Sequence, residues 1–270
     1  MASSVAVTED AIMNEHKNRV TSRFGESAAD YATSEVHAQG ESLGVLLELT
    51  RPRNEWQMLD VGTGAGHTAI AFAPHVSSVI ASDLTPGMLK QAEALAAARG
   101  ITNVTTQLAD AEALPFEDAS FDFVTCRMAF HHFQQPESAL SEMARVLKPN
   151  GALGFTDNYT VGDAPSADFY NRYEIIRDPS HFRVGSLSQL RAQMTSHGFN
   201  ITAERQLSKE FEFHAWADRQ RVSDDDKAEL MQMMRDIPDA LRVLMQPRFA
   251  ARTMYFLLGE VVFVASANPP

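Results

Sequence analysis

Cysteine is almost absent from this 270-residue sequence, and the one present, Cys126, has no partner for an intramolecular disulfide. The disulfide frameworks of small secreted domains are therefore excluded. Positive charge is also scarce, because 23 Lys and Arg residues stand against 35 Asp and Glu residues and give a net charge of −12. Nucleic acids and anionic membranes attract positively charged surfaces, so we expect non-specific binding to neither.

Long hydrophobic runs are missing as well. The longest apolar stretch, Tyr255 to Ala267, contains Gly259 and Glu260 and is too short to span a bilayer. The N-terminus shows neither the basic region nor the apolar core of a secretory signal. We therefore expect a cytoplasmic protein without a membrane span.

The sequence does contain short apolar runs that alternate with helical stretches. Five runs predict strands at 57–61, 79–83, 104–109, 121–125 and 152–156. Helices are expected at 65–73, 86–99 and 136–147 between them, and at 11–23 and 33–49 before them. This alternation is typical of βαβ units and a mainly parallel sheet.

The rest of the chain repeats this pattern with one long interruption. A helix is expected at 187–197, a sixth strand at 201–207 and a seventh at 254–265. The segment between the last two strands, 208–253, is rich in Met, Asp and Arg and is expected to be a mostly helical insertion.

The sharpest local signal is the loop after the first strand, Asp60-Val61-Gly62-Thr63-Gly64-Ala65-Gly66-His67. Glycines at such a turn let the backbone approach a ligand closely. The spacing is G-x-G-x-G, whereas dinucleotide sites need a further glycine where His67 stands. By itself the loop is also compatible with a plain strand-to-helix turn or an NAD site.

Further polar residues follow the next strands in order. Asp83 ends the second strand, where a carboxylate can accept hydrogen bonds from both hydroxyls of a ribose. Asp110 and Ala111 follow the third strand and can meet an adenine edge. The fourth strand leads into Arg127-Met128-Ala129-Phe130-His131-His132, and Glu142-Met143-Ala144-Arg145-Val146-Leu147-Lys148-Pro149-Asn150-Gly151 comes next.

In this order the motifs resemble class I S-adenosylmethionine (SAM)-dependent methyltransferases. Within them the chain is similar to the small-molecule branch called methyltransferase type 11, which includes the ubiquinone and menaquinone C-methyltransferases. The resemblance runs from about Phe24 to Phe199, and Met254 to Ala265 fits the family's last strand. It implies an α/β, Rossmann-like fold, with a seven-stranded, mostly parallel sheet whose last strand is antiparallel, helices on both faces and a helical cap.

The same resemblance suggests a division of the chain. Residues 1–53 would be a helical segment that closes the site, and 54–207 would be the SAM-binding core. Residues 208–253 would form the helical cap, and 254–270 the final strand and a tail.

SAM is the implied cofactor, and S-adenosylhomocysteine (SAH) the implied product. Matching positions suggest which residues contact SAM, although Met88 at a helical position could equally be core. These residues are Tyr31, Asp60, Gly62, Gly64, Gly66, Asp83, Leu84, Met88, Asp110, Ala111 and Arg127.

Methyl transfer is an in-line displacement, and it needs a general base only when the acceptor must lose a proton. His131 and His181 are candidate catalytic residues, because imidazole can take a proton near neutral pH. Asp178 could orient His181. The alternative is that these histidines only pack, and that 177–183 is a loop shaped by an Asp-Pro turn.

The acceptor is expected between the N-terminal helices, the loop at 177–183 and the insertion. Candidate substrate-binding residues are His132, Tyr159, Arg177 and Arg183, and Asp157 and Asn158 could also line the pocket. Apolar surface for the acceptor could come from Phe211, Phe213, Trp216, Met231, Met233 and Met234, which could equally be core.

The expected function is transfer of a methyl group from SAM to a small hydrophobic or aromatic metabolite, at carbon or oxygen. Two alternatives remain, namely a SAM-dependent enzyme that catalyses rearrangement or elimination, and a non-catalytic SAM-binding protein. No metal-ligand spacing is evident. A nucleic-acid substrate is not expected, since Asn268-Pro269-Pro270 lacks the aromatic residue and the position of the N-methyltransferase motif. The oligomeric state is left open, with a homodimer as one alternative.

Overall fold

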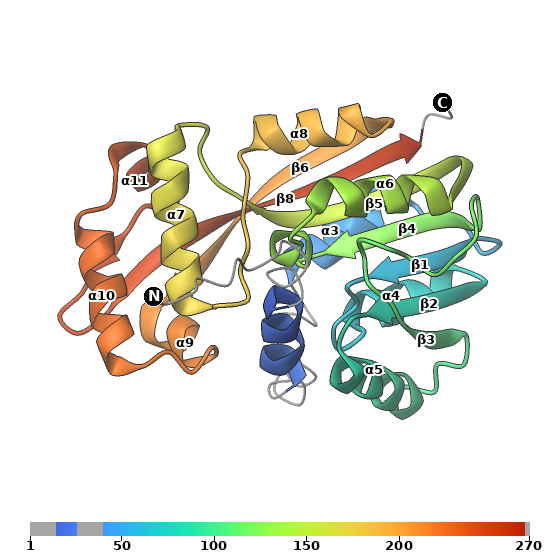
Figure 1. Ribbon diagram of the computed structural model, residues 1–270, viewed down its shortest axis with the longest axis horizontal. Coiled ribbons are helices and arrows are strands. Elements are labelled where there is room, and N and C mark those ends of the chain that lie inside the picture. Colours follow the sequence, from blue (N-terminus) through green and yellow to red (C-terminus); the bar gives the residue numbers. More distant parts are fainter. Residues whose placement is uncertain (1–14, 26–39, 268–270) are drawn as a thin grey trace, which may run out of the picture.

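The computed structural model describes residues 15–25 and 40–267. Figure 1 shows a twisted sheet with helices around it, and a smaller group of helices at the far end of two long strands. In the described part of the chain, no helix is both long and apolar enough to cross a membrane.

The sheet contains seven long strands and one short one. The long strands are β1 (Gln57–Val61), β2 (Ser78–Asp83), β3 (Val104–Leu108), β4 (Phe121–Arg127), β5 (Leu147–Tyr159), β6 (Phe199–Glu212) and β8 (Met254–Ala267). The short strand β7 (Arg248–Phe249) pairs with the beginning of β8. This short strand is an addition to the seven strands that were expected.

The strand order is β3-β2-β1-β4-β5-β8-β6. The pairs from β3 to β5 are parallel, whereas β8 runs antiparallel to both of its neighbours. The expected mostly parallel sheet with an antiparallel last strand is therefore confirmed. Because the order reverses at β1 and β4, the carboxyl ends of these strands border a crevice, where open sheets bind ligands.

Helices cover both faces of this sheet, and alternate strand residues feed a core on each face. Met58 packs with α3 (Glu41–Thr50) and α4 (His67–Phe72), whereas its neighbour Leu59 packs on the side of α6 (Pro136–Val146) and α8 (Leu187–Ser196). The short helix η1 (Ala73–His75) continues α4, and α5 (Pro86–Ala98) packs on β2 and β3.

A second helical group forms the cap, which contains α7 (Ala164–Arg177), α9 (Phe213–Asp218), α10 (Asp224–Arg235) and α11 (Asp239–Met245). These helices surround the outer halves of β6 and β8, which extend beyond the rest of the sheet (Figure 1). Their shared core includes Tyr173, Trp216 and Phe256. The helical character expected of 208–253 is found in α9, α10 and α11, although β6 continues to Glu212.

Helix α7 was not predicted from the sequence. Its buried positions include the polar residues Asn171 and Glu174 beside Tyr170 and Tyr173, so it shows no apolar stripe at helical spacing. At the N-terminus, a helix covers residues 15–25, where 11–23 was expected. The helix expected at 33–49 is described only from residue 41, as α3.

Candidate functional site

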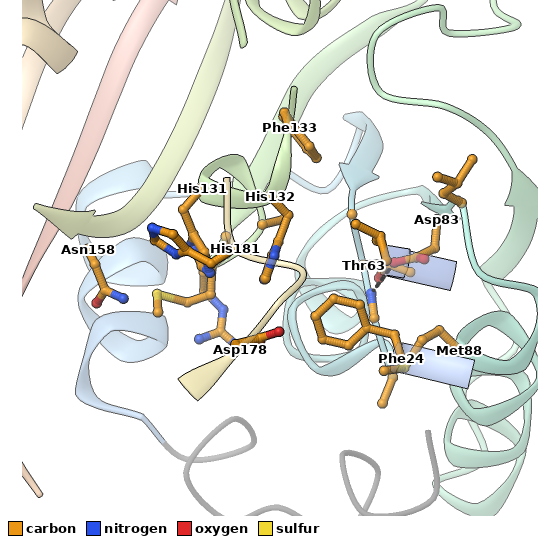
Figure 2. A pocket seen from close by; sticks show the side chains of 18 of the residues that line it. Phe24, Thr63, Asp83, Met88, His131, His132, Phe133, Asn158, Asp178 and His181 are labelled. Carbon is orange, nitrogen blue, oxygen red and sulfur yellow. Dashed lines mark hydrogen bonds between the residues drawn. The ribbon is translucent and has the colours of Figure 1, made fainter. Parts of the chain in front are cut away.

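One cavity connects the glycine loop to the cap. Its volume is about 590 Å³, within the range of roughly 300–1,000 Å³ that is usual for small-ligand pockets. Figure 2 shows Thr63, Asp83 and Met88 at one end, and Asn158 and His181 at the other. Walls come from the carboxyl ends of the parallel strands, the helix at 15–25, α7 and the β6–β8 pair.

The glycine loop presents its backbone to this cavity. Gly64 has a φ of +54°, and a Cβ added to it would meet no protein atom within 4 Å. Its N–H donates to Oδ2 of Asp83 at 2.9 Å, while the N–H of Thr85 donates to Oδ1 at 2.8 Å. The loop is thus tied to the end of β2 with an open cradle beside Gly64.

Gly66 has a different role from Gly64. A Cβ at Gly66 would lie 2.7 Å from the Cβ of Ala92, so the missing side chain lets the loop pack closely on α5. Gly66 does not line the cavity. It therefore supports the loop from behind.

Asp60 also lies behind the cavity wall. Its Oδ2 accepts hydrogen bonds from Oγ1 of Thr63 at 2.6 Å and from the N–H of Ala69 at 3.2 Å. Its Oδ1 accepts one from Oγ1 of Thr125 at 2.6 Å. Burial raises the pKa of Asp60, and these hydrogen bonds lower it in part. The carboxyl joins β1, the loop, α4 and β4 and fixes the loop's shape.

The residues present at this end of the cavity fit SAM. The open cradle at Gly64 leaves room for a bound molecule, and the acids Asp83 and Asp110 suit a ligand with a ribose, an adenine and a positive charge. Of the expected SAM contacts, those that line the cavity are Gly62, Gly64, Asp83, Leu84, Met88, Asp110, Ala111 and Arg127. Tyr31 lies outside the described residues.

The helix at 15–25 lies across this cavity and touches both ends of it. Lys17 Nζ is 2.6 Å from Oδ2 of Asp110 and 2.6 Å from Oε2 of Glu112. His16 donates through Nε2 to the carbonyl of His132 at 2.9 Å. Arg23 donates to the carbonyl of Gln220, which follows α9. The helix therefore bridges the sheet domain and the cap.

His131 is held by the carboxylate of Asp157 at the middle of the cavity. The ring donates through Nδ1 to Oδ1 at 2.6 Å, and the backbone N–H donates to Oδ2 at 3.0 Å. Burial by itself would lower the pKa of His131, but the charge and hydrogen bond of Asp157 outweigh it and raise the pKa above 6.5. Among the described residues, Nε2 has no hydrogen-bond partner, so this nitrogen can accept a proton.

The pKa values of the two neighbouring histidines, His132 and His181, are lowered and not raised. His132 donates through Nδ1 to the carbonyl of Ser180 at 2.9 Å, and burial together with the charge of His131 lowers its pKa to about 4. His181 donates through Nε2 to Oδ1 of Asn171 at 2.8 Å. Burial and the nearby positive charges lower the pKa of His181 to about 2. Both rings are therefore neutral at physiological pH.

Asp178 does not orient His181, contrary to expectation. Its Oδ1 accepts hydrogen bonds from the N–H and the hydroxyl of Ser180 instead, and Asn171 on α7 holds the His181 ring. The sequence could not show this, because Asn171 belongs to the helix that was not predicted. A base with so low a pKa as His181 would take a proton only weakly.

Some of the candidate substrate-binding residues line the cavity, and others do not. His132 and Arg177 line the cavity, as do Phe211 and Trp216. Arg183 is half exposed and pairs with Asp168 on the outer surface of α7 at 3.0 Å. Asn158 lines the cavity as well. The other candidates, which do not line the cavity, are Asp157, Tyr159, Phe213, Met231, Met233 and Met234.

Tyr159 packs on Gly259 of β8, while Phe213 and the three methionines pack in or against the cap core. Phe213 and the three methionines are therefore part of the protein core, which was the alternative to a role in acceptor binding. Sequence reasoning missed Glu174, which lines the cavity from α7. Within the described residues, no group of three or more His, Cys, Asp or Glu could hold a metal ion.

Comparison with known proteins gives consistent results. A family described as a methyltransferase domain, Methyltransf_11, matches residues 59–155. The uncharacterized methyltransferase YcgJ of Bacillus subtilis is 36% identical over 219 residues, which are 81% of this chain and 87% of that protein. Its crystal structure has a TM-score of 0.82 at 32% identity, and the match covers 85% of this chain and 99% of that one.

A shorter match joins the chain to an enzyme named for its substrate. The demethylmenaquinone methyltransferase of Deinococcus radiodurans is 42% identical over 100 residues, which are 36% of this chain and 41% of that protein.

A second solved structure, of a protein from Bacillus halodurans C-125, is similar over most of the chain. It has a TM-score of 0.81 at 35% identity, and the match covers 85% of this chain and 100% of that one.

Proposed function

Because the chain belongs to the class I SAM-dependent methyltransferases, in the branch called methyltransferase type 11, we propose that it methylates a small molecule bound in the cap half of its cavity. SAM is its cofactor. The observation that carries the proposal is the continuity of the cavity, which joins the cradle at Gly64 to the histidines and the cap. A bound acceptor there would face the cofactor.

The chain contributes mainly by holding the two reactants in line. Bound SAM supplies an electrophilic methyl group. The glycine loop and Asp83 would hold the cofactor, and the helix at 15–25 would exclude water above it. Correct orientation of two reactants in this way contributes about 7–11 kcal/mol to lowering a barrier.

His131 is the proposed general base. Its Nε2 is open among the described residues, and Asp157 fixes the opposite nitrogen as the one that carries the proton. The raised pKa of His131 makes it a better proton acceptor than His132 or His181, whose pKa values are lowered. The proposal for a catalytic histidine therefore favours His131 over His181.

An acceptor with a hydrophobic or aromatic body suits the cap half of the cavity. Phe211, Trp216 and Leu258 contribute apolar surface there, while His131 and Arg177 contribute polar atoms. The name of the Deinococcus relative supports a planar quinol-type acceptor, although this chain matches less than half of that protein. Methylation at carbon or at oxygen is compatible with the site.

The remaining parts of the proposal follow from the same site. Gly62, Gly64 and Asp83 would contact SAM directly, and Asp60 and Gly66 would support them from behind the wall. The division at residues 53, 207 and 253 stays a prediction, with α7 as an additional part of the cap. A cytoplasmic location is part of the same proposal.

The test has two steps. Calorimetry should show SAM binding that is weakened in Asp83→Asn and unchanged in Asp224→Asn, a control at a fully exposed carboxylate. Incubation with labelled SAM and a panel of phenols, quinols and enols should then produce SAH and a labelled product. SAM binding without SAH formation would favour the non-methylating alternatives, and the proposal fails if SAM does not bind.

A further inference from the structure

Arg177 lies over a stack of aromatic rings at the cavity wall. It ends α7, and its guanidinium carbon is 4.5 Å from the centre of the Trp216 ring. Trp216 in turn stacks on Tyr173, with ring centres 5.2 Å apart and planes 14° from parallel. Phe256 packs edge-on against Trp216 at 5.1 Å. All three rings are fully buried, so the guanidinium is fixed in orientation.

This guanidinium uses few of its hydrogen-bond donors. An arginine has five N–H donors, and among the described residues Arg177 makes one hydrogen bond, from Nε to the Trp216 carbonyl at 3.4 Å. The nearest carboxylate oxygen, Oε2 of Glu174, is 3.6 Å from Nη1 and thus beyond hydrogen-bond distance. The Arg177 side chain is 17% exposed and lines the cavity. A partly buried cation with open donors is suited to an oxygen of a ligand.

Several titratable side chains surround Arg177. Glu174 faces it from α7, and Asp178 directly follows this helix. His131, His132 and His181 also line the cavity, as do Lys209 of β6, Asp218 of α9 and Glu260 of β8. Glu174 is buried, and its Oε1 has no partner among the described residues. Burial raises the pKa of Glu174, and the charge of Arg177 lowers it in part, so the guanidinium is not held by a close ion pair and can contact an acceptor. Extra negative charge appears only when the acceptor loses its proton.

We propose that Arg177 binds the oxygen of the acceptor on which negative charge develops, and that the acceptor is therefore a planar phenol or enol. This inference rests on the proposed function, because it assigns the substrate class of the same cavity. The acceptor would lie with its oxygen between the guanidinium of Arg177 and Nε2 of His131.

The proton and electrons are then accounted for. The O–H bond of the acceptor breaks, and its proton goes to Nε2 of His131. The electron pair stays on the oxygen, where Arg177 stabilises it, or is delocalised onto the conjugated carbon. That oxygen or carbon forms the new bond to the methyl carbon. The bond between sulfur and the methyl carbon breaks, and its electron pair stays on sulfur. SAM is thereby converted to SAH.

The experiment uses 4-nitrophenol as a probe, because its phenolate absorbs visible light. We expect the full-length protein loaded with SAH to bind the probe and to lower the pKa of the bound phenol below that of the free phenol. Arg177→Gln should abolish this shift and weaken phenolate binding about tenfold to a hundredfold, as expected for a charged hydrogen bond. Arg183→Gln, at the exposed arginine on the same segment, should change neither quantity.

Trp216 provides a second readout. The chain has two tryptophans, so in a Trp56→Phe background the fluorescence reports on Trp216 and should be quenched by the probe. Arg177→Lys keeps the charge but not the planar fork, and should restore part of the shift. Unchanged SAM affinity in both Arg177 variants would show that the cavity has kept its fold.

Several results would overturn the inference. These are no binding of 4-nitrophenol at millimolar concentration, a bound phenol with an unshifted pKa, or equal effects of Arg177→Gln and Arg183→Gln. A different result would count against the proposed function alone, namely an Arg177-dependent shift in a protein that forms no SAH with any acceptor. Conversely, SAH formation unaffected by Arg177→Gln would reject only the role of Arg177.

Discussion

Asp157 gives two adjacent histidines different roles. His131 and His132 have ring centres only 4.1 Å apart, yet only His131 bonds to a carboxylate. The negative charge of Asp157 raises the pKa of His131 despite its burial, and the resulting positive charge helps lower that of His132. At the residue scale, one carboxylate therefore selects which of two neighbouring rings can act as a base.

Replacing Asp157 by Asn should lower kcat about tenfold to a hundredfold, within the range for general-base catalysis. Neutral His131 is the active form, so the wild-type kcat should rise with pH through a pKa above 6.5. In Asp157→Asn this inflection should move to lower pH, because burial then dominates. The dependence of kcat on pH measures both effects. Asp168→Asn, at a carboxylate on the outer surface, is the control. An inflection at the same pH in Asp157→Asn and in the wild type would contradict the role of Asp157.

The glycine loop offers a matched pair of substitutions. Both Gly64 and Gly66 have positive φ, so Ala at either position costs about 1–2 kcal/mol of backbone strain. Gly64→Ala should also weaken SAM binding, because its Cβ would enter the cradle. Gly66→Ala should lose about 1–3 kcal/mol more of unfolding free energy, since its Cβ meets Ala92.

Calorimetry with SAM and urea unfolding of the SAM-free protein separate these two effects. Equal loss of SAM affinity and equal loss of stability in both variants would show that the two glycines do not have distinct roles.

At the element scale, the helix at 15–25 is attached by polar contacts and not by a large apolar core. Lys17 bonds to Asp110 and Glu112 beside the expected adenine site, and His16 bonds to the backbone of η2 (Phe130–His132). Such contacts can break and re-form more readily than a packed core. We therefore expect this helix to open when cofactor and acceptor exchange.

Replacing both His16 and Lys17 by Gln should loosen this helix. We expect SAM to dissociate faster and its Kd to rise about tenfold, because hydrogen bonds to charged groups are lost on the cavity side. Hydrogen exchange of residues 15–25 should also become faster. Arg19→Gln is the control, since Arg19 is half exposed and, among the described residues, pairs with Glu15 alone. Unchanged SAM dissociation in the double variant would argue against a closing role.

The elements also differ in how well the sequence predicted them. β1 was predicted at its observed bounds, and α5 and α8 within one residue, because each has clear apolar residues and a glycine or proline at an end. α7 was missed because its buried side carries the polar residues Asn171, which holds the His181 ring, and Glu174, which lines the cavity. Its polar inner face removed the periodicity by which helices are found.

At the scale of the whole molecule, the two ends of the cavity belong to different parts of one sheet. β6 and β8 pair over almost their full length, and they carry the cap beyond the edge of the sheet. The cap is therefore carried by strands other than β1, which precedes Gly64, and β2, which ends at Asp83.

The net charge of −12 leads to a prediction at the same scale. The protein should not bind double-stranded DNA or transfer RNA in low-salt buffer, because its overall field repels polyanions. Fluorescence anisotropy with labelled oligonucleotides measures this directly, with a basic DNA-binding domain as positive control. Salt-sensitive binding at micromolar concentration would instead favour a nucleic-acid acceptor.

The sequence by itself determined the alternation of strands and helices and the glycine loop, because these depend on local patterns of apolar residues, turns and glycines. The cofactor class followed from the family resemblance that the order of the motifs carries. Only the tertiary structure decided which residues share the acceptor space. It placed Arg177 on Trp216, separated Arg183 and Tyr159 from the cavity, and gave His131 its carboxylate. The physical reason is that these contacts join segments 26 to 39 residues apart, and such pairings leave no periodic or local signal in the sequence.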